Sequence, residues 1–151
     1  MLSARRATAE DAEELARMAA ELTAAGPGPW TARLAAFFRE SLGTDRVAAF
    51  VIEREGGLAS CASATITRSV PGPDHHGVYA HIHTVYTDPG HRRRGCARAA
   101  VTALTDWLAE QGATLITLNA SDDGAPLYLS IGFTYNDRAM RRIRHPRPLD
   151  S

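Results

Sequence analysis

The stretch of this sequence with the most chemical potential runs from residue 81 to residue 104, HIHTVYTDPGHRRRGCARAAVTAL. In it, three arginines at 92–94 precede Gly95 and Ala97, where we expect a helix to begin. The first N–H groups of a helix have no partner within it, and with the positive end of the helix dipole they form an anion site. Gly95 allows close backbone approach, Ala97 keeps the first turn small, and arginine pairs bidentately with phosphate. This turn therefore predicts a site for a pyrophosphate group.

The same stretch contains groups that could carry protons. Alternation along a strand would place four side chains on one face, those of His81, His83, Val85 and Thr87. An imidazole with a pKa near 6.5 accepts a proton directly or through a water molecule. Alternatively, each histidine is a half-buried strand residue, or the pair binds a metal together with His75 or His76. No acidic residue lies at ligand spacing, so we expect no metal site.

A strand, a turn and a helix in direct succession must position these groups. Residues 78–87 are β-branched and aromatic, and from Ala97 the apolar residues recur at steps of three and four until Gly112. Residues 113–119 form a continuous apolar run, typical of a buried strand. The remaining segments predict a strand at 3–8, helices at about 11–25 and 30–42, a hairpin of strands 46–54 and 58–70, a short helix ending near 131, and one or two strands within 133–144. The order of elements is that of a mixed α/β fold.

Composition narrows the class of protein. The chain has 151 residues, 17 basic and 17 acidic, and all its basic residues are arginine, which with the Ala-rich stretches suggests a bacterial genome. Its length predicts one domain over residues 1–151. Without a 20-residue apolar run or a signal-peptide pattern, we expect a cytoplasmic protein that does not bind membranes. Cys61 and Cys96 form no CxxC motif and fit a reducing compartment.

The turn and the segments around it resemble a known family. Arg92-x-x-Gly95-x-Ala97 after a strand is similar to the (Gln/Arg)-x-x-Gly-x-(Gly/Ala) signature of the GCN5-related N-acetyltransferases, the GNAT superfamily. The opening residues 5–12, and the segment from Leu118 through Pro126-Leu127-Tyr128 to Gly132-Phe133, also resemble this family. The resemblance covers nearly the whole chain. It implies a GNAT fold, in which a mixed, mostly antiparallel sheet is splayed between strands four and five and flanked by about four helices.

The resemblance also implies acetyl-CoA as a cosubstrate and no metal. Main-chain groups of residues 85–87 would pair with the pantetheine arm like an added strand, and N–H groups of the turn would cradle the pyrophosphate. The side chain of Asn119 would bond the pantetheine. The expected cofactor-binding residues are Val85, Tyr86, Thr87, Arg92, Arg93, Arg94, Gly95, Cys96, Ala97, Arg98 and Asn119. For the Cys96 side chain, packing is favoured over a covalent acyl-cysteine route, although a thiol at a helix start can have a lowered pKa.

Catalytic roles follow from the same resemblance. Tyr128 occupies the family's frequent general-acid position; the other interpretation is a core tyrosine. Counting back from the signature, His81 falls where the histone-acetylating members have a catalytic glutamate. His83 competes with His81 for the role of base, and a water molecule could also take it.

We therefore expect an N-acetyltransferase that moves an acetyl group to a primary amine by direct attack in a ternary complex. The alternative from another class is a non-catalytic acyl-CoA sensor of the same fold. A third alternative, nucleic-acid binding through residues 92–94 and 138–147, is disfavoured by the neutral net charge. The acceptor, a small-molecule or peptide amine, has no motif that identifies it, and a homodimer is possible.

Overall fold

The computed structural model describes residues 2–144, which divide between two compact units, one ending at Asn119 and one beginning at Ala120. The first unit holds a sheet in the order β1-β2-β3-β4-β5, in which all neighbours are antiparallel except β4 and β5. Its strands are β1 (Arg5–Arg6), β2 (Val47–Arg54), β3 (Gly57–Arg68), β4 (Val78–Thr87) and β5 (Leu115–Leu118). Its helices are α1 (Ala12–Leu22), α2 (Pro29–Ser41) and α3 (Cys96–Glu110), and the second unit holds α4 (Ala125–Ser130). The single domain over residues 1–151 stays a prediction.

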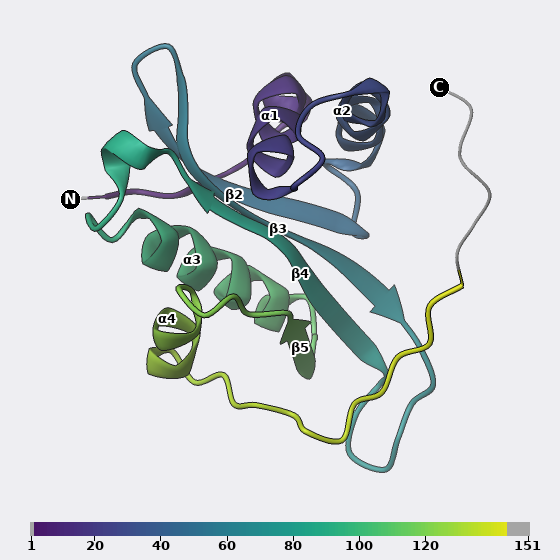
Figure 1. Cartoon of the computed structure of the whole chain (residues 1–151). Coiled ribbons are helices and arrows are strands. Elements are labelled where there is room, and N and C mark those ends of the chain that lie inside the picture. Colours follow the sequence, from purple (N-terminus) through teal and green to yellow (C-terminus); the bar gives the residue numbers. More distant parts are fainter. Residues whose placement is uncertain (1, 145–151) are drawn as a thin grey trace. The chain divides into compact units, whose positions relative to one another are not determined.

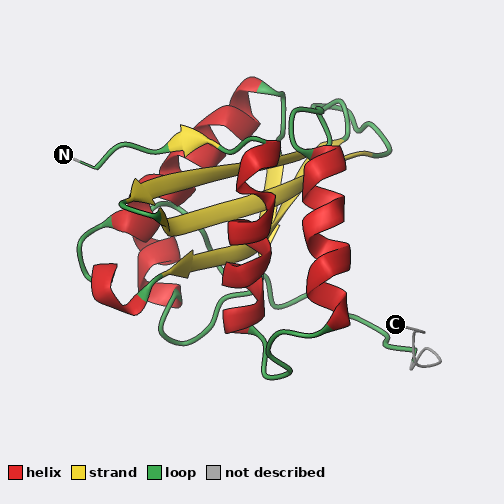
Figure 2. Ribbon diagram, turned by 90° about the horizontal axis from the view of Figure 1, so that it is seen from above, coloured by secondary structure: helices red, strands yellow, loops and turns green. Residues whose placement is uncertain are grey.

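Helices cover both faces of the sheet in the first unit. α1 and α2 lie over one face, and α3 lies over the other (Figures 1 and 2). The predicted stripe of α3 is confirmed, because its buried residues recur at steps of three and four: Cys96, Ala100, Val101, Leu104 and Leu108. β3 is buried over most of its length because both of its faces are covered.

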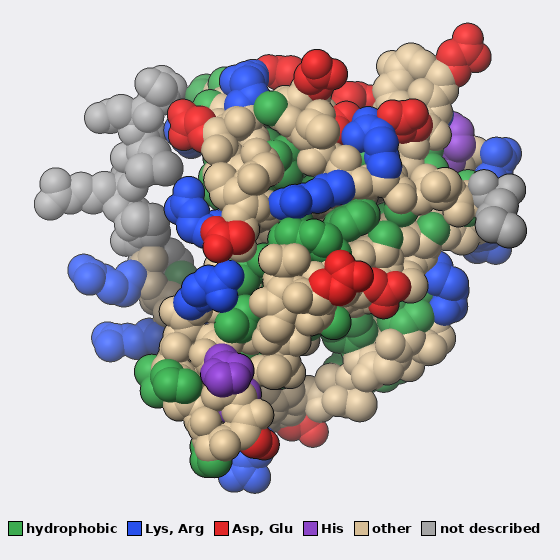
Figure 3. All heavy atoms as spheres, turned by 180° about the vertical axis from the view of Figure 1, so that it is seen from behind, with side chains coloured by type: hydrophobic (Ala, Val, Ile, Leu, Met, Phe, Trp, Pro, Cys, Tyr) green, Lys and Arg blue, Asp and Glu red, His purple; other side chains and the backbone are tan. Residues whose placement is uncertain are grey.

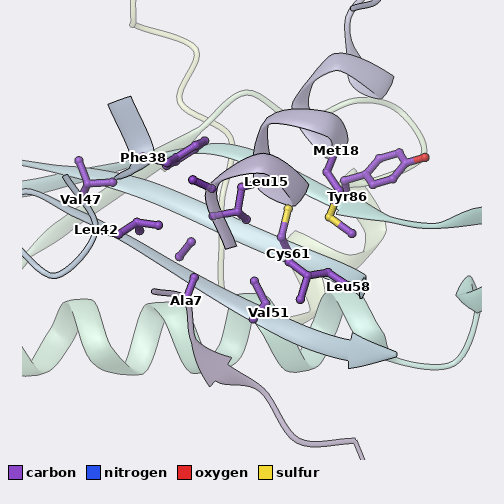
Figure 4. Close-up of a cluster of buried hydrophobic side chains, with 12 residues drawn as sticks. Ala7, Leu15, Met18, Phe38, Leu42, Val47, Val51, Leu58, Cys61 and Tyr86 are labelled. Atoms are coloured by element: carbon purple, nitrogen blue, oxygen red, sulfur yellow. The ribbon is translucent and has the colours of Figure 1, made fainter. Parts of the chain in front are cut away.

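The core under α1 and α2 joins these helices to the three central strands (Figure 4). Leu15 and Met18 of α1 and Phe38 of α2 pack against side chains from one face of the sheet. The sheet residues of this cluster include Val47, Val51, Cys61 and Tyr86. On the opposite face, Cys96 packs with Ile52 and Ala59.

The long strand β4 changes its pairing halfway along. Against β3, Thr84 is opposite Ser63 while Ile82 is opposite Ala64, so His83 is an extra residue in a β-bulge. Against β5, pairing ends at Ile82 opposite Leu118. The second half of β4, up to Thr87, therefore has a strand on only one side, and this is the predicted splay between strands four and five.

The bulge corrects one predicted face. Val85 is opposite Ala62, and Thr87 is opposite Ser60, whereas His81 is opposite Thr65. Opposite residues share a face, and Thr65 is an odd number of positions from Ala62 and Ser60, so Val85 and Thr87 do not share the face of His81. The prediction of one face for all four residues was wrong because the extra residue reverses the alternation.

Two predicted strands also differ from the structure. Within the described residues, 133–144 form no strand; polar and charged residues interrupt the alternation there, and Tyr135, Met140 and Ile143 are exposed. The predicted buried run at 113–119 is the short strand β5, whose residues are exposed or half-buried. It lies at the edge of the sheet, where an apolar sequence does not ensure burial. α1 ends at Leu22, earlier than predicted, because Thr23 is already extended.

Candidate functional site

The predicted anion site has the backbone of a cradle. Gly95 precedes α3 in the left-handed conformation with φ 82°, and Arg93 also has a positive φ, 63°. Positive φ is uncommon for a residue other than glycine, and such turns bring successive N–H groups together in anion-binding concavities. The first helical bond at this end runs from Ala99 N–H to Gly95 O. Within residues 2–144, the N–H groups of Arg93, Gly95, Cys96 and Ala97 have no hydrogen-bond partner.

The side chains of this turn point in different directions. Arg92 turns back to β4, where its Nε donates to Thr87 O at 2.9 Å and its guanidinium lies over the Tyr86 ring at 5.7 Å. Arg93 and Arg94 are exposed, as is Arg98 within the first turn of α3. The Cys96 side chain is 3% exposed and packs into the sheet, so only its main chain can reach a ligand in the cradle.

The second half of β4 offers main-chain groups at an open edge. Asp88 N–H donates to Ala59 O of the β3 ladder. Hydrogen-bonded and non-hydrogen-bonded pairs alternate in an antiparallel ladder. Tyr86 therefore directs its N–H and C=O to β3, and Val85 and Thr87 direct theirs to the open edge. A strand-like ligand could bond Val85 on both groups and the Thr87 N–H, while the Thr87 carbonyl is held by Arg92. Asn119 is exposed directly after β5.

A cluster of charged residues fixes the turn between this edge and the cradle. The Asp88 carboxylate, 14% exposed, accepts from Arg17 of α1 at 3.2 Å and from Arg54 of β2 at 3.1 Å. Arg17 also bonds Glu14, whose carboxylate accepts from Leu58 N–H at 3.0 Å. These contacts tie Asp88 to α1 and to the β2–β3 hairpin. The arginine partners hold the pKa of the Glu14 carboxyl below its ordinary value, against the effect of burial.

The histidines of β4 form a row of polar side chains across three strands. His83 Nε2 lies 2.8 Å from the Thr65 hydroxyl of β3, and His81 Nδ1 lies 2.6 Å from the Thr117 hydroxyl of β5. The two imidazoles meet edge to face, with ring centroids 4.8 Å apart. Burial, and next the proximity of His81, lower the pKa of His83 below its ordinary value. His83 is therefore neutral at pH 7 and can accept a proton.

Tyr128 belongs to the second unit. It lies on α4, where its ring meets Phe133 edge to face with centroids 5.9 Å apart. Burial raises the pKa of its hydroxyl, which keeps the proton on the group at neutral pH. Within the described residues this hydroxyl has no hydrogen-bond partner, so its proton is not committed to another group of that part of the chain.

The metal and nucleic-acid alternatives gain no support. Residues 2–144 contain no group of three or more His, Cys, Asp or Glu side chains that could hold a metal ion. His75 Nδ1 accepts from Gly77 N–H at 3.0 Å, and its ring lies against Tyr79. Arginine and carboxylate side chains are interspersed on the face shown in Figure 3. Residues 145–147 of the second arginine group lie outside the described residues.

No helix of the described part is long and apolar enough to span a bilayer.

Sequence reasoning did not single out the residues that contact the turn and the two histidines: Asp88, Arg17, Arg54, Thr65 and Thr117. Asp88 opens the Asp-Pro-Gly turn directly after the strand predicted at 78–87. Its arginine partners are 34 and 71 residues away in the sequence. Thr117 could have been found from the register alone, because a parallel pair of β4 and β5 puts it beside His81.

Comparisons with known proteins identify the family and the fold of the chain. The model of the acetyltransferase (GNAT) family matches residues 15–133. No curated protein matches the chain. Its fold is shared by a GCN5-related N-acetyltransferase from Ralstonia eutropha JMP134, with 23% identity and a TM-score of 0.76 over 95% of this chain and 99% of that one. A predicted acetyltransferase from Clostridium acetobutylicum, solved with acetyl-CoA, has 21% identity and a TM-score of 0.81 over 95% of this chain and 96% of that one. Glucosamine-6-phosphate N-acetyltransferase from Arabidopsis thaliana has 21% identity and a TM-score of 0.76 over 95% of this chain and 98% of that one. With its family model covering most of the sequence, this chain belongs to the GNAT acetyltransferase family.

Proposed function

We propose that this protein is an acetyl-CoA-dependent N-acetyltransferase that acts on a primary amine. One observation carries the proposal: the open main-chain edge of Val85 and Thr87 leads, through the turn at Asp88, into the unpartnered N–H groups that open α3. A pantetheine arm followed by a diphosphate needs these two kinds of group in this order. The residues present therefore fit acetyl-CoA, which supplies the thioester.

The diphosphate would be held by N–H groups of residues 93–98 and by the nearby arginine side chains. Each exposed contact of this kind contributes about 0.3–1 kcal/mol, so several must act together. Val85 and Thr87 would hold the pantetheine amides, with Asn119 as a further side-chain partner. Arg92 would keep the edge in place through its bond to Thr87 O.

The amine nitrogen must lose two protons during the transfer, and the departing sulfur must gain one. An amine with a pKa near 10.4 is less than about one part in a thousand neutral at pH 7, so it must lose a proton before it attacks. His81 or His83 accepts that proton. The N–C bond to the acetyl group forms, the C–S bond of the thioester breaks, and Tyr128 donates a proton to the departing sulfur. The nitrogen then loses its second proton, which restores the Tyr128 hydroxyl. The raised pKa of Tyr128 suits this role because the hydroxyl is protonated when it is needed.

The acceptor is proposed only as a class. Two of the structural relatives are aminoglycoside acetyltransferases, one solved with CoA and one with sisomicin, at 17% and 15% identity. At that identity the likeness shows the fold alone. The panel of acceptors to be screened should therefore contain both small-molecule and peptide amines.

The direct test combines calorimetry with a thiol-release assay. We expect heat of binding when CoA is titrated into the protein, and release of thiol from acetyl-CoA with at least one amine of a broad panel. No heat with CoA would overturn the proposal. Binding without turnover across the whole panel would instead favour the acyl-CoA sensor.

The role of Tyr128 has its own variant. Tyr128→Phe keeps the ring that packs on Phe133 and removes the proton, so kcat should fall by about 100-fold or more while the affinity for CoA stays the same. Tyr135→Phe is the matched control, because Tyr135 is 70% exposed in the same unit, and it should keep full activity. Equal kcat for Tyr128→Phe and the wild type would remove Tyr128 from the mechanism.

A further inference from the structure

The two histidines of β4 use opposite nitrogens for their neighbours. His81 contacts Thr117 through Nδ1, the ring nitrogen closer to its own main chain. His83 contacts Thr65 through Nε2, the nitrogen at the far end of the ring. Of these two histidines, His81 alone therefore leaves its distal nitrogen without a hydrogen-bond partner among the described residues. A group that takes a proton from a bound amine must present a lone pair outward, and His81 Nε2 is placed to do so.

We propose that His81 is the general base, acting through Nε2, and that Thr117 is a positioning residue whose hydroxyl accepts the His81 Nδ1–H. This inference rests on the proposed acetyl transfer. Which ring nitrogen of a histidine carries the proton is set by the hydrogen bond that the other nitrogen makes. With its hydroxyl oxygen as acceptor, Thr117 selects the tautomer whose Nε2 is free. A histidine side chain in water favours the tautomer with its proton on Nε2, so the contact with Thr117 must reverse that preference.

The contact between His81 and Thr117 follows from the register of the sheet. His81 and Thr117 are direct partners in the parallel pair of β4 and β5, one position before that pairing ends. The neighbouring histidine is brought close by the bulge, which inserts His83 next to His81 on the face of Thr65. Strand pairing on both sides therefore fixes the main chain beneath His81 at the border of the open edge.

The proton balance needs no group beyond those already named. A proton leaves the acceptor nitrogen and binds His81 Nε2, and the ring becomes an imidazolium whose Nδ1–H still donates to Thr117. The half-buried ring then returns the proton to water. His83, with its pKa lowered, stays neutral beside this imidazolium and adds no second positive charge.

The test measures the tautomer directly, in the free protein. Long-range 1H–15N spectra at pH 8.5, well above the ordinary imidazole pKa of about 6.5, should show His81 with its proton on Nδ1. Thr117→Val keeps the shape and the strand preference of the side chain, and it should move the proton to Nε2. It should also lower kcat by about 10-fold and leave the KM for acetyl-CoA unchanged. Thr117→Ser should restore both the tautomer and kcat.

Two variants on β3 control for the loss of a threonine hydroxyl. Thr65→Val should shift the signals of His83 and leave the tautomer of His81 as it is. Thr67→Val, an exposed position outside the row, should change neither histidine nor kcat. A wild-type His81 with its proton on Nε2, or a Thr117→Val protein with an unchanged tautomer, would overturn the inference.

Failure of the inference differs from failure of the proposed function. The spectra are recorded without substrate, so they decide the hydrogen bond between Thr117 and His81 even in a protein that acetylates nothing. If the wild type acetylates an amine and His81→Ala keeps its kcat, the base assignment fails while the acetyltransferase stands. If the wild type binds no CoA, the proposed function fails and takes the catalytic part of the inference with it.

Discussion

The two halves of β4 differ in how their main chains are paired and therefore in which groups they can offer to a ligand. Up to Ile82 the strand is hydrogen-bonded on both sides, to β3 and to β5, and it presents His81 from a fixed main chain. After the bulge at His83 it is paired on one side only, and its main-chain groups are what a ligand can use. The first half offers side-chain chemistry and the second half offers backbone chemistry, so β4 does both because β5 stops early.

The strongest test of this difference places proline, in two separate variants, at adjacent positions of the second half of β4. Tyr86→Pro removes an N–H that points to β3 and also the buried Tyr86 ring, so it should destabilise the fold by about 3 kcal/mol or more. Val85→Pro removes an N–H that points to the open edge, where proline is tolerated. It should leave the unfolding midpoint within a few degrees and raise the KM for acetyl-CoA about 3- to 10-fold, the cost of one hydrogen bond.

Denaturant unfolding and steady-state kinetics on both proteins check this prediction. Equal loss of stability in the two variants would mean that Val85 and Tyr86 do not point to opposite edges. A stable Val85→Pro protein with an unchanged KM would mean that the open edge is not used by the cosubstrate.

The second prediction concerns the turn that joins the open edge to the cradle. Asp88→Asn removes the charge that two arginines share and should cost about 1–3 kcal/mol of stability. Because Asp88 holds the turn, the KM for acetyl-CoA should also rise several-fold while kcat changes less. Asp45→Asn is the matched control, since its pair with Arg68 is exposed on both sides and should contribute at most about 1 kcal/mol. A KM that rises equally in both variants would exclude a special role for the turn.

The smallest expected effect is a pH dependence of stability from the bulge. The pKa of His83 is lowered in the folded protein, so folding favours its neutral form. Above the ordinary value of 6.5 this costs nothing, and stability falls as the pH drops through 6.5 toward the folded value. Urea unfolding at pH 7.5 and 5.5 measures the fall, and His83→Gln should reduce it. The lowered carboxyl pKa values of Asp11 and Glu14 act only at more acidic pH. An equal fall in both proteins would count against His83 as its source.

Local patterns were enough to predict the strand, turn and helix around the cradle. Gly95, the arginines and the apolar stripe of α3 are contiguous in sequence, so their spacing carried the signal. The bulge at His83 left no such signal, because it arises from pairing with β3, and it reversed the face of Val85 and Thr87. The partners of Asp88 come from α1 and β2, which only the tertiary fold brings together. The one or two strands predicted within 133–144 do not form in the described residues, because polar and charged residues interrupt any alternation there.

Because both cysteines are buried, the native protein should react only slowly with thiol-reactive reagents. Cys61 is 1% exposed with its pKa raised to about 12 by burial, and Cys96 is 3% exposed. The sequence has no lysine, so no ε-amine of the protein competes with an added acceptor. A thiol-reactive dye mixed with the native protein would therefore count released coenzyme A against almost no background.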